Sequence, residues 1–252
     1  SRVGSEMCIR DRKEATDEEK KVLAKYVGWG GLAQAFDEHN VAWQNEYKEL
    51  KDVLSVEEYA AAKGSVLNAH YTSKTVIDGI YKALTRFGVK GNNRILEPAT
   101  GTGNFFGLLP DTMAGSKLHG VEIDPLTGKI AKQLYQKANI AVQGFEETKL
   151  PDDHFDVVIG NVPFGDFKVN DSRYNAQKFL IHDYFFAKAL DKVRPGGIVA
   201  FITSNCSVRI ICRKPPTISL KWQRMSMSWR KRWIPFYRSC LLYTSDAADD
   251  KA

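Results

Sequence analysis

The interior of this 252-residue chain contains no cysteine. Its four cysteines lie near the two ends without a Cys-x-x-Cys pair, so the chain offers neither a disulfide framework nor the spacing of a metal site. No apolar run approaches the roughly 20 residues that cross a bilayer, and the N-terminus has no secretory signal pattern. We therefore expect a cytoplasmic protein with no membrane or metal partner.

The body of the chain also lacks the positive charge that a net charge of +6 suggests. Residues 206–240 hold nine Lys and Arg residues and no acid. Without these nine positive charges, the remainder of the chain has a net negative charge. The basicity belongs to one tail and does not indicate that the body binds nucleic acid. Both ends, residues 1–12 and 239–249, resemble translated sequencing-adapter sequence.

Hydrophobic periodicity stops abruptly near the C-terminus. It is clear up to Ser204, but residues 205–237 sustain no period of 2 or 3.6. We expect residues 205–252 to be a frame-shifted or non-native tail; the alternative is a basic, aromatic segment that binds single-stranded nucleic acid. The remainder divides into an N-terminal helical segment, 13–67, and an α/β core, 68–204.

Short apolar runs alternate with helical patterns from Asn93 onward. The runs are nearly continuous Val, Ile, Leu and Phe, as in parallel strands that are buried on both faces. Strands separated by helices or crossover segments indicate a Rossmann-like, doubly wound, mostly parallel α/β sheet. The predicted strands span 94–97, 117–123, 139–143, 155–160 and 198–203, and a helix is predicted over 176–193.

Two signals at strand ends point to a nucleotide-like ligand. The first predicted strand ends at Glu97 and continues as Pro98-Ala99-Thr100-Gly101-Thr102-Gly103, a glycine turn that lets a ligand approach the backbone. Alone, this pattern is equally typical of a tight turn. The second strand ends at Glu122, about 20 residues on, where a doubly wound fold holds ribose hydroxyls. Asp124 is the second choice for holding the ribose; alternatively, it caps the next helix. Any cofactor that contains adenosine fits these two signals.

The tetrapeptide Asn161-Val162-Pro163-Phe164, directly after the fourth strand, indicates the chemistry. The Asn161 amide oxygen and the Val162 carbonyl supply two neighbouring acceptors, and Pro163 holds the preceding residue extended. Such acceptors suit the exocyclic amine of a heteroaromatic ring. When they accept hydrogen bonds from the two amine hydrogens, the nitrogen lone pair is more available to an incoming methyl group. Phe164 offers a flat face on which a flipped-out base can stack.

Together these motifs resemble S-adenosylmethionine-dependent N6-adenine DNA methyltransferases with gamma-type motif order. They are most similar to the methylase part of methylase–helicase proteins of conjugative elements and phages. The resemblance implies direct transfer of a methyl group from S-adenosylmethionine to adenine N6 in DNA, catalysed by Asn161, Val162, Pro163 and Phe164. Val162 departs from the family's first proline, and Phe145 stands where an acid usually follows glycine. The implied cofactor-binding residues are Tyr71, Thr72, Glu97, Ala99, Thr100, Gly101, Gly103, Glu122, Ile123 and Glu146.

The family resemblance also sets expectations about completeness. The family fold needs two further strands and a target-recognition domain beyond Thr203, so we expect a C-terminally truncated chain that is fused to a helicase in the full-length protein. Two alternatives stay open. The chain could methylate RNA or a protein glutamine amide, or it could be a non-catalytic cofactor-binding fragment.

Overall fold

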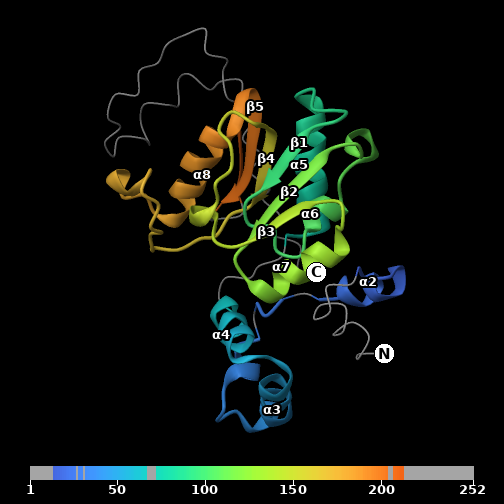
Figure 1. Cartoon of the computed structure of the whole chain (residues 1–252), viewed down its shortest axis with the longest axis vertical. Helices are drawn as coiled ribbons and strands as arrows, with labels where there is room; N and C mark the ends of the chain where they lie inside the picture. Colours follow the sequence, from blue (N-terminus) through green and yellow to red (C-terminus); the bar gives the residue numbers. More distant parts are fainter. Residues whose placement is uncertain (1–13, 27, 31, 67–71, 204–206, 213–252) are drawn as a thin grey trace, which may run out of the picture.

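One sheet organises the computed structural model, which describes residues 14–26, 28–30, 32–66, 72–203 and 207–212 (Figure 1). The strands lie in the order β3-β2-β1-β4-β5-β6, and all neighbours are parallel except β5 and β6. Because β1 has β2 on one side and β4 on the other, the sheet is doubly wound, which confirms the predicted fold class. The strands are β1 Arg94–Glu97, β2 Lys117–Glu122, β3 Asn139–Val142, β4 Phe155–Asn161, β5 Val193–Thr203 and β6 Ser207–Cys212.

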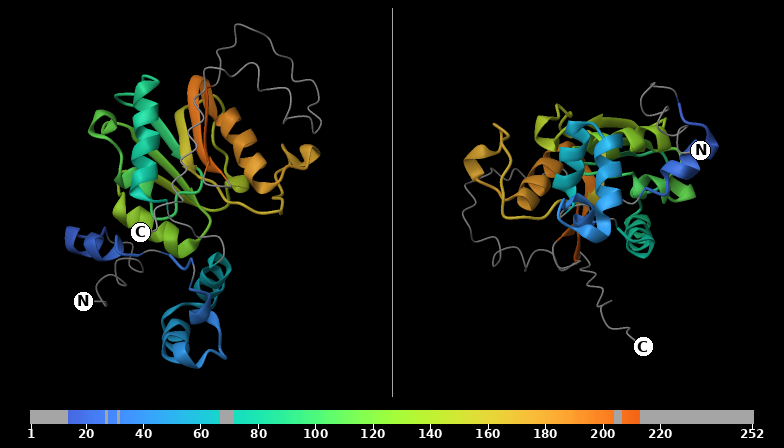
Figure 2. Two further views of the ribbon diagram at one scale, coloured as in Figure 1. Left: turned by 180° about the vertical axis from the view of Figure 1, so that it is seen from behind. Right: turned by 90° about the horizontal axis from the view of Figure 1, so that it is seen from below.

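Successive strand side chains point to opposite faces of the sheet, and this divides the core in two. Ile95 and Val157 pack on the face covered by α5 (Lys74–Arg86), whereas Leu96 and Val158 pack on the face covered by α8 (Ile181–Lys192). Figure 2 shows these two helices on opposite sides of the sheet. Both faces are buried, which explains why the strands are apolar runs and not alternating ones. The helices of the core are α5 Lys74–Arg86, α6 Asn104–Gly107, α7 Pro125–Leu134 and α8 Ile181–Lys192.

The N-terminal extension is helical, as predicted, and has a small core of its own. Two of its helices begin with capping boxes, Thr16 with Glu19 and Ser55 with Glu58, which satisfy the first backbone N–H groups. Phe36 lies at the centre of its aromatic cluster and contacts Trp29 and Tyr59 at ring-centroid distances of 5.4 Å. The helices of the extension are α2 Asp17–Leu23, α3 Gln44–Val53 and α4 Val56–Ser65, and its 3-10 turns span Ala33–Phe36 and Val41–Trp43. Three further 3-10 turns lie in the core and span Asp111–Met113, Phe145–Glu147 and Asn175–Gln177.

The extension is attached to the core through α7. Leu23 of α2 packs against Ile130, and Lys129 forms a 3.2 Å ion pair with Glu58 at the start of α4. In Figure 1, α3 and α4 lie below the sheet, and α4 is close to α7. This places α4 beside the carboxyl ends of the strands. Within the described residues, no helix is long and apolar enough to cross a membrane.

Two element boundaries around α8 differ from the prediction. The helix begins at Ile181 and not at residue 176, because Lys178 adopts a left-handed backbone (φ 54°) that interrupts a helix. At its other end, β5 begins at Val193, earlier than predicted. The β4–β5 register shifts between Phe155 and Val157, so residues 194–197 form an irregular segment within the strand.

The sixth strand corrects a prediction from the sequence. Residues after Ser204 lack sustained periodicity, and no further strand was expected there. The backbone of β6 nevertheless pairs antiparallel with β5, from Thr203 opposite Ser207 to Ile198 opposite Cys212. A hairpin strand at an edge is held mainly by backbone hydrogen bonds to its neighbour, so a period of 2 is not required for it to form. The rest of the predicted tail, residues 213–252, lies outside the described residues.

Candidate cofactor pocket and active site

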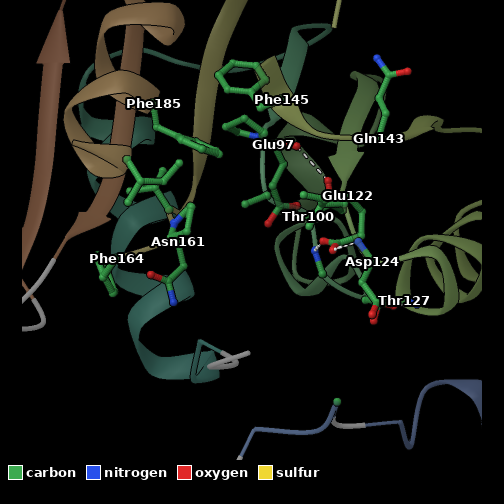
Figure 3. Close-up of a pocket in the computed structure, with 18 of the residues that line it drawn as sticks. Glu97, Thr100, Glu122, Asp124, Thr127, Gln143, Phe145, Asn161, Phe164 and Phe185 are labelled. Atoms are coloured by element: carbon green, nitrogen blue, oxygen red, sulfur yellow. Dashed lines mark hydrogen bonds between the residues drawn. The ribbon is translucent and has the colours of Figure 1, made fainter. Parts of the chain in front are cut away.

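A cavity of about 470 Å³ opens at the carboxyl ends of β1, β2 and β4, the edge at which doubly wound sheets bind ligands. Figure 3 shows Asn161 and Phe164 on one side of it, and Glu122, Asp124 and Thr127 on the other. It is therefore a single space with two ends. The predicted site residues that line it are Thr72, Glu97, Ala99, Thr100, Gly101, Glu122, Ile123, Glu146, Asn161, Val162, Pro163 and Phe164.

Two other predicted residues stand apart from this set. Tyr71 lies outside the described residues. Gly103 is not among the residues that line the cavity, although its φ of 87° requires glycine. A Cβ atom there would collide with the ring of Tyr135, which packs behind the turn. The positive φ and the contact with Tyr135 give Gly103 a role in shaping the turn.

The glycine turn is held from both sides by hydrogen bonds. The Thr100 hydroxyl donates to the Glu97 carbonyl (2.8 Å), and the Thr100 N–H donates to the Val121 carbonyl (2.9 Å). Gly101 has a left-handed φ of 57°, and its N–H donates to the Glu122 carboxylate (2.7 Å). The ends of β1 and β2 are therefore tied together at the cavity wall.

Glu122 is almost completely buried and accepts a backbone hydrogen bond on each carboxylate oxygen. One comes from Gly101, and the other from the N–H of Asp124 (2.8 Å). Burial raises the pKa of Glu122, although the two backbone hydrogen bonds oppose that shift. Because a carboxylate oxygen has two acceptor positions, each can still receive a hydroxyl from a ligand.

Asp124 caps α7, as the alternative interpretation of the sequence expected. Its carboxylate accepts the N–H of Thr127 (2.7 Å), which satisfies one free donor at the helix start. Ile123, between the two acids, is 70% exposed and lines the cavity. An apolar side chain in that position can cover a planar ring. Gln143, directly after β3, lines the same end; sequence reasoning missed it, and its position after a strand end was the available signal.

Glu97 is buried at the floor of the cavity, and its Oε2 has no hydrogen-bond partner among the described residues. Burial raises the pKa of Glu97 well above its ordinary value, and the nearby Glu122 carboxylate adds to the shift. A buried acid without a hydrogen-bond partner lowers the stability of the free protein. A cation or a hydrogen-bond donor of a ligand would therefore bind most favourably at this position.

We expect Glu97→Gln to make the free protein more stable at neutral pH and to flatten the dependence of its stability on pH. Since the pKa of Glu97 is higher in the folded than in the unfolded chain, its contribution to stability is fully present at low pH. That contribution is lost as the pH rises, by at most about 1.4 kcal/mol per pH unit. Urea unfolding of both proteins between pH 5 and 8 measures this; a difference that does not change with pH would contradict the raised pKa.

The other end of the cavity is built from the residues after β4. Asn161 ends that strand, paired with Ile202 of β5, and Val162 is buried in the core on the α8 face. Phe164 is half-buried against the same core. The fixed strand end therefore presents the Asn161 side chain and the ring of Phe164 to one space.

Apolar side chains that sequence reasoning did not select enclose this end. Phe167 and Val169 come from the segment after the tetrapeptide, and Ile181 and Phe185 come from the start of α8. Tyr26, Gly28, Ala61 and Gly64 of the N-terminal extension also line the cavity. The residues of α8 and of the N-terminal extension are distant in sequence from both motifs, and no local pattern distinguishes any of these residues from ordinary core or loop residues.

Lys188 of α8 connects the two ends of the cavity from behind. Its buried ammonium donates to the Phe145 carbonyl (2.7 Å) and to the Asp171 carboxylate (2.9 Å). Burial lowers the pKa of Lys188, while Asp171 opposes the shift. One bond reaches the turn after β3 and the other reaches the segment after β4. The two bonds together tie the turn after β3 to the segment after β4.

The strand order, with a glycine turn after β1, an acid at the end of β2 and an Asn-x-Pro-Phe motif after β4, resembles the arrangement in S-adenosylmethionine-dependent methyltransferases. Residues 112–211 match a family model described as "Eco57I restriction-modification methylase". The match extends past Ser204 into β6, as the strand pairing does.

Individual proteins show the same likeness. The chain is 28% identical over 236 residues to "Defense against restriction protein B" of Escherichia phage P1, covering 90% of this chain and 8% of the phage protein. It is 35% identical over 94 residues to the type II methyltransferase M.CvrRI of Paramecium bursaria Chlorella virus XZ-6E, covering 37% of this chain and 24% of the viral protein. The family model and the viral methyltransferase confirm the resemblance to DNA methyltransferases. The chain spans only a small part of both relatives.

Among solved structures, one match is an S-adenosylmethionine-dependent O-methyltransferase from Thermotoga maritima. It is 19% identical with a TM-score of 0.40, over 54% of this chain and 47% of that one. The fold assignment therefore rests on the strand order itself. Among the described residues, no group of three or more His, Cys, Asp or Glu side chains is arranged to hold a metal ion.

Proposed function

We propose that this chain transfers a methyl group from S-adenosylmethionine to the N6 amino group of adenine in DNA. The observation that carries the proposal is that the glycine turn and the tetrapeptide Asn161–Phe164 line one cavity, from the ends of the adjacent strands β1 and β4. Neighbouring strands lie roughly 5 Å apart, so groups at their ends can hold two reactants in contact.

The residues at one end of the cavity fit an adenosine-bearing cofactor. Glu122 has acceptor positions for ribose hydroxyls, and the exposed Ile123 can cover one face of an adenine ring. The unpaired oxygen of Glu97 lies deeper and suits a positively charged group or a donor. When bound, S-adenosylmethionine supplies a methyl group on a positively charged sulfur. Thr72 at the cavity wall is the proposed contact of its methionine end.

The residues at the other end fit an aromatic amine. In the proposed complex, the Asn161 amide oxygen and the Val162 carbonyl accept the two hydrogens of adenine N6. This would draw the nitrogen lone pair out of the ring plane and toward the methyl group. As the nitrogen–carbon bond formed, the sulfur–carbon bond would break and release S-adenosylhomocysteine, and the nitrogen would lose one proton. Phe164 stacks on the base, which must leave the duplex to enter the cavity. The protein acts by position and electrostatics, without a covalent intermediate.

Methyl transfer to DNA, RNA and protein, offered in parallel, tests the proposal. With S-adenosylmethionine labelled in the methyl group, we expect label in DNA, and we expect nuclease digestion to release it as N6-methyladenine. Label in RNA or in a protein glutamine would support the alternative substrates instead. Label in none of the three would contradict the proposal and favour a cofactor-binding fragment. The fusion to a helicase stays a prediction, since the chain spans 8% of the phage relative.

A further inference from the structure

Two exposed apolar side chains belong to the cavity. Of the large hydrophobic residues that are exposed within the described ranges, only Ile123 and Phe167 line it. Ile123 is at the cofactor end, and Phe167, 47% exposed, is at the end formed by the tetrapeptide and α8. An exposed aromatic ring costs free energy unless a ligand covers it. Phe167 therefore offers a flat apolar surface at this end of the cavity, which a ligand in the cavity can cover.

The backbone holds Phe167 in place on both sides. Its carbonyl accepts the N–H of Ile181 (2.9 Å), which ties the segment to the first turn of α8. On the other side, a Cβ atom at Gly165 would lie 2.7 Å from the ring of Phe167. Gly165 also has a φ of 153°, which side chains disfavour. The glycine therefore leaves room for the ring, and the hydrogen bond anchors the Phe167 backbone beside the start of α8.

The surroundings of Phe167 select a flat, apolar ligand. Phe164, Val169 and Phe185 line the same end, and the first two pack against the core below. The polar group that adjoins them is the Asn161 amide. A planar heteroaromatic ring with one amino group matches an apolar compartment with a polar group at one edge.

We propose that Phe167 is a positioning residue for the target base, and that its ring packs on the extrahelical adenine at the mouth of the cavity. This inference rests on the proposed function. It assigns to the chain a second aromatic contact, in addition to the one that the tetrapeptide supplies. Stacking on an aromatic ring is available to any base, so Phe167 contributes affinity for an extruded base and not a choice of sequence.

DNA binding by Phe167→Ala tests the inference at the site that methylation mapping identifies. Two duplexes are compared, one with the target adenine and one with an abasic nucleotide in its place. We expect Phe167→Ala to bind the adenine duplex roughly five- to 150-fold more weakly than the unmodified protein, the range that base–aromatic stacking gives. On the abasic duplex, we expect equal affinities. The KM for DNA should rise by the same factor, whereas cofactor affinity should not change.

Two further variants sharpen the result. Phe167→Trp should restore the affinity for the adenine duplex, because the indole offers a larger flat face. Phe87→Ala removes a ring that is 37% exposed but does not line the cavity, and it should leave both affinities unchanged. An equal loss of affinity for both duplexes would mean that Phe167 fills the space that the extruded base leaves in the DNA duplex, and this would overturn the inference. Unchanged affinity for both duplexes would overturn it as well. If the unmodified protein methylates no DNA, the proposed function itself fails, which is a distinct outcome.

Discussion

Replacing Asn161 by alanine is expected to reduce methyl transfer at least about 100-fold while leaving cofactor affinity unchanged. Loss of one preorganised hydrogen-bonding group at a reacting atom typically costs that much. The side chain lines the cavity at the end of β4, and the backbone pairing with Ile202 does not depend on it. Initial rates with labelled S-adenosylmethionine, together with calorimetric titration of the cofactor, measure both quantities.

Asn161→Asp is the matched variant, because it keeps an acceptor oxygen in the same place. It should retain more activity than Asn161→Ala, and both should melt at the temperature of the unmodified protein. If Asn161→Ala instead abolished cofactor binding, the side chain would belong to the cofactor end, and the catalytic assignment would be wrong.

The second large effect is expected at Glu122, where alanine should weaken cofactor binding at least about 100-fold. The substitution removes the acceptor for ribose hydroxyls, and it also leaves the buried N–H groups of Gly101 and Asp124 without their partner. An unsatisfied buried donor costs about 1–3 kcal/mol, and here two donors shape the turn that meets the ligand. Titration with S-adenosylhomocysteine avoids turnover during the measurement.

An analogue without the ribose hydroxyls separates the two contributions of Glu122. The unmodified protein should prefer the complete ligand over the dideoxy analogue, and Glu122→Gln should reduce that preference. Glu147→Gln is the control, because the same change is made at an exposed glutamate beside the pocket that does not line it. An undiminished preference in Glu122→Gln would show that another group holds the ribose.

The sequence could predict the sheet and the two motif ends of the cavity because each is encoded locally. Glu97 to Gly101 and Asn161 to Phe164 are consecutive residues at the ends of apolar runs, so a strand prediction places them directly. Glu122 follows from its distance to the turn. The fold then brings these ends together through parallel pairing, which chain order alone implies.

The remaining parts depend on contacts that no local pattern reveals. Phe167 looks like any loop aromatic until the start of α8 is placed beside it. The turn needs a glycine at position 103 whether or not a ligand touches it, so the sequence pattern alone does not separate a conformational role from a binding role. The left-handed backbone at Lys178 and the edge strand β6 were missed because neither has a marked side-chain pattern.

The order of strands in the sheet also has a kinetic consequence. β1 must pair with β4, and the hydrogen bond from the Arg94 N–H to Asp156 that accompanies this pairing joins residues 62 positions apart. Contacts between such distant segments form slowly, because the loop between them must first be closed. The cavity is lined by residues from Tyr26 to Phe185, so it is complete only when the last long-range pairing has formed. A ligand that binds only the completed cavity favours the native state over partly folded chains, and it does so more strongly as its concentration rises.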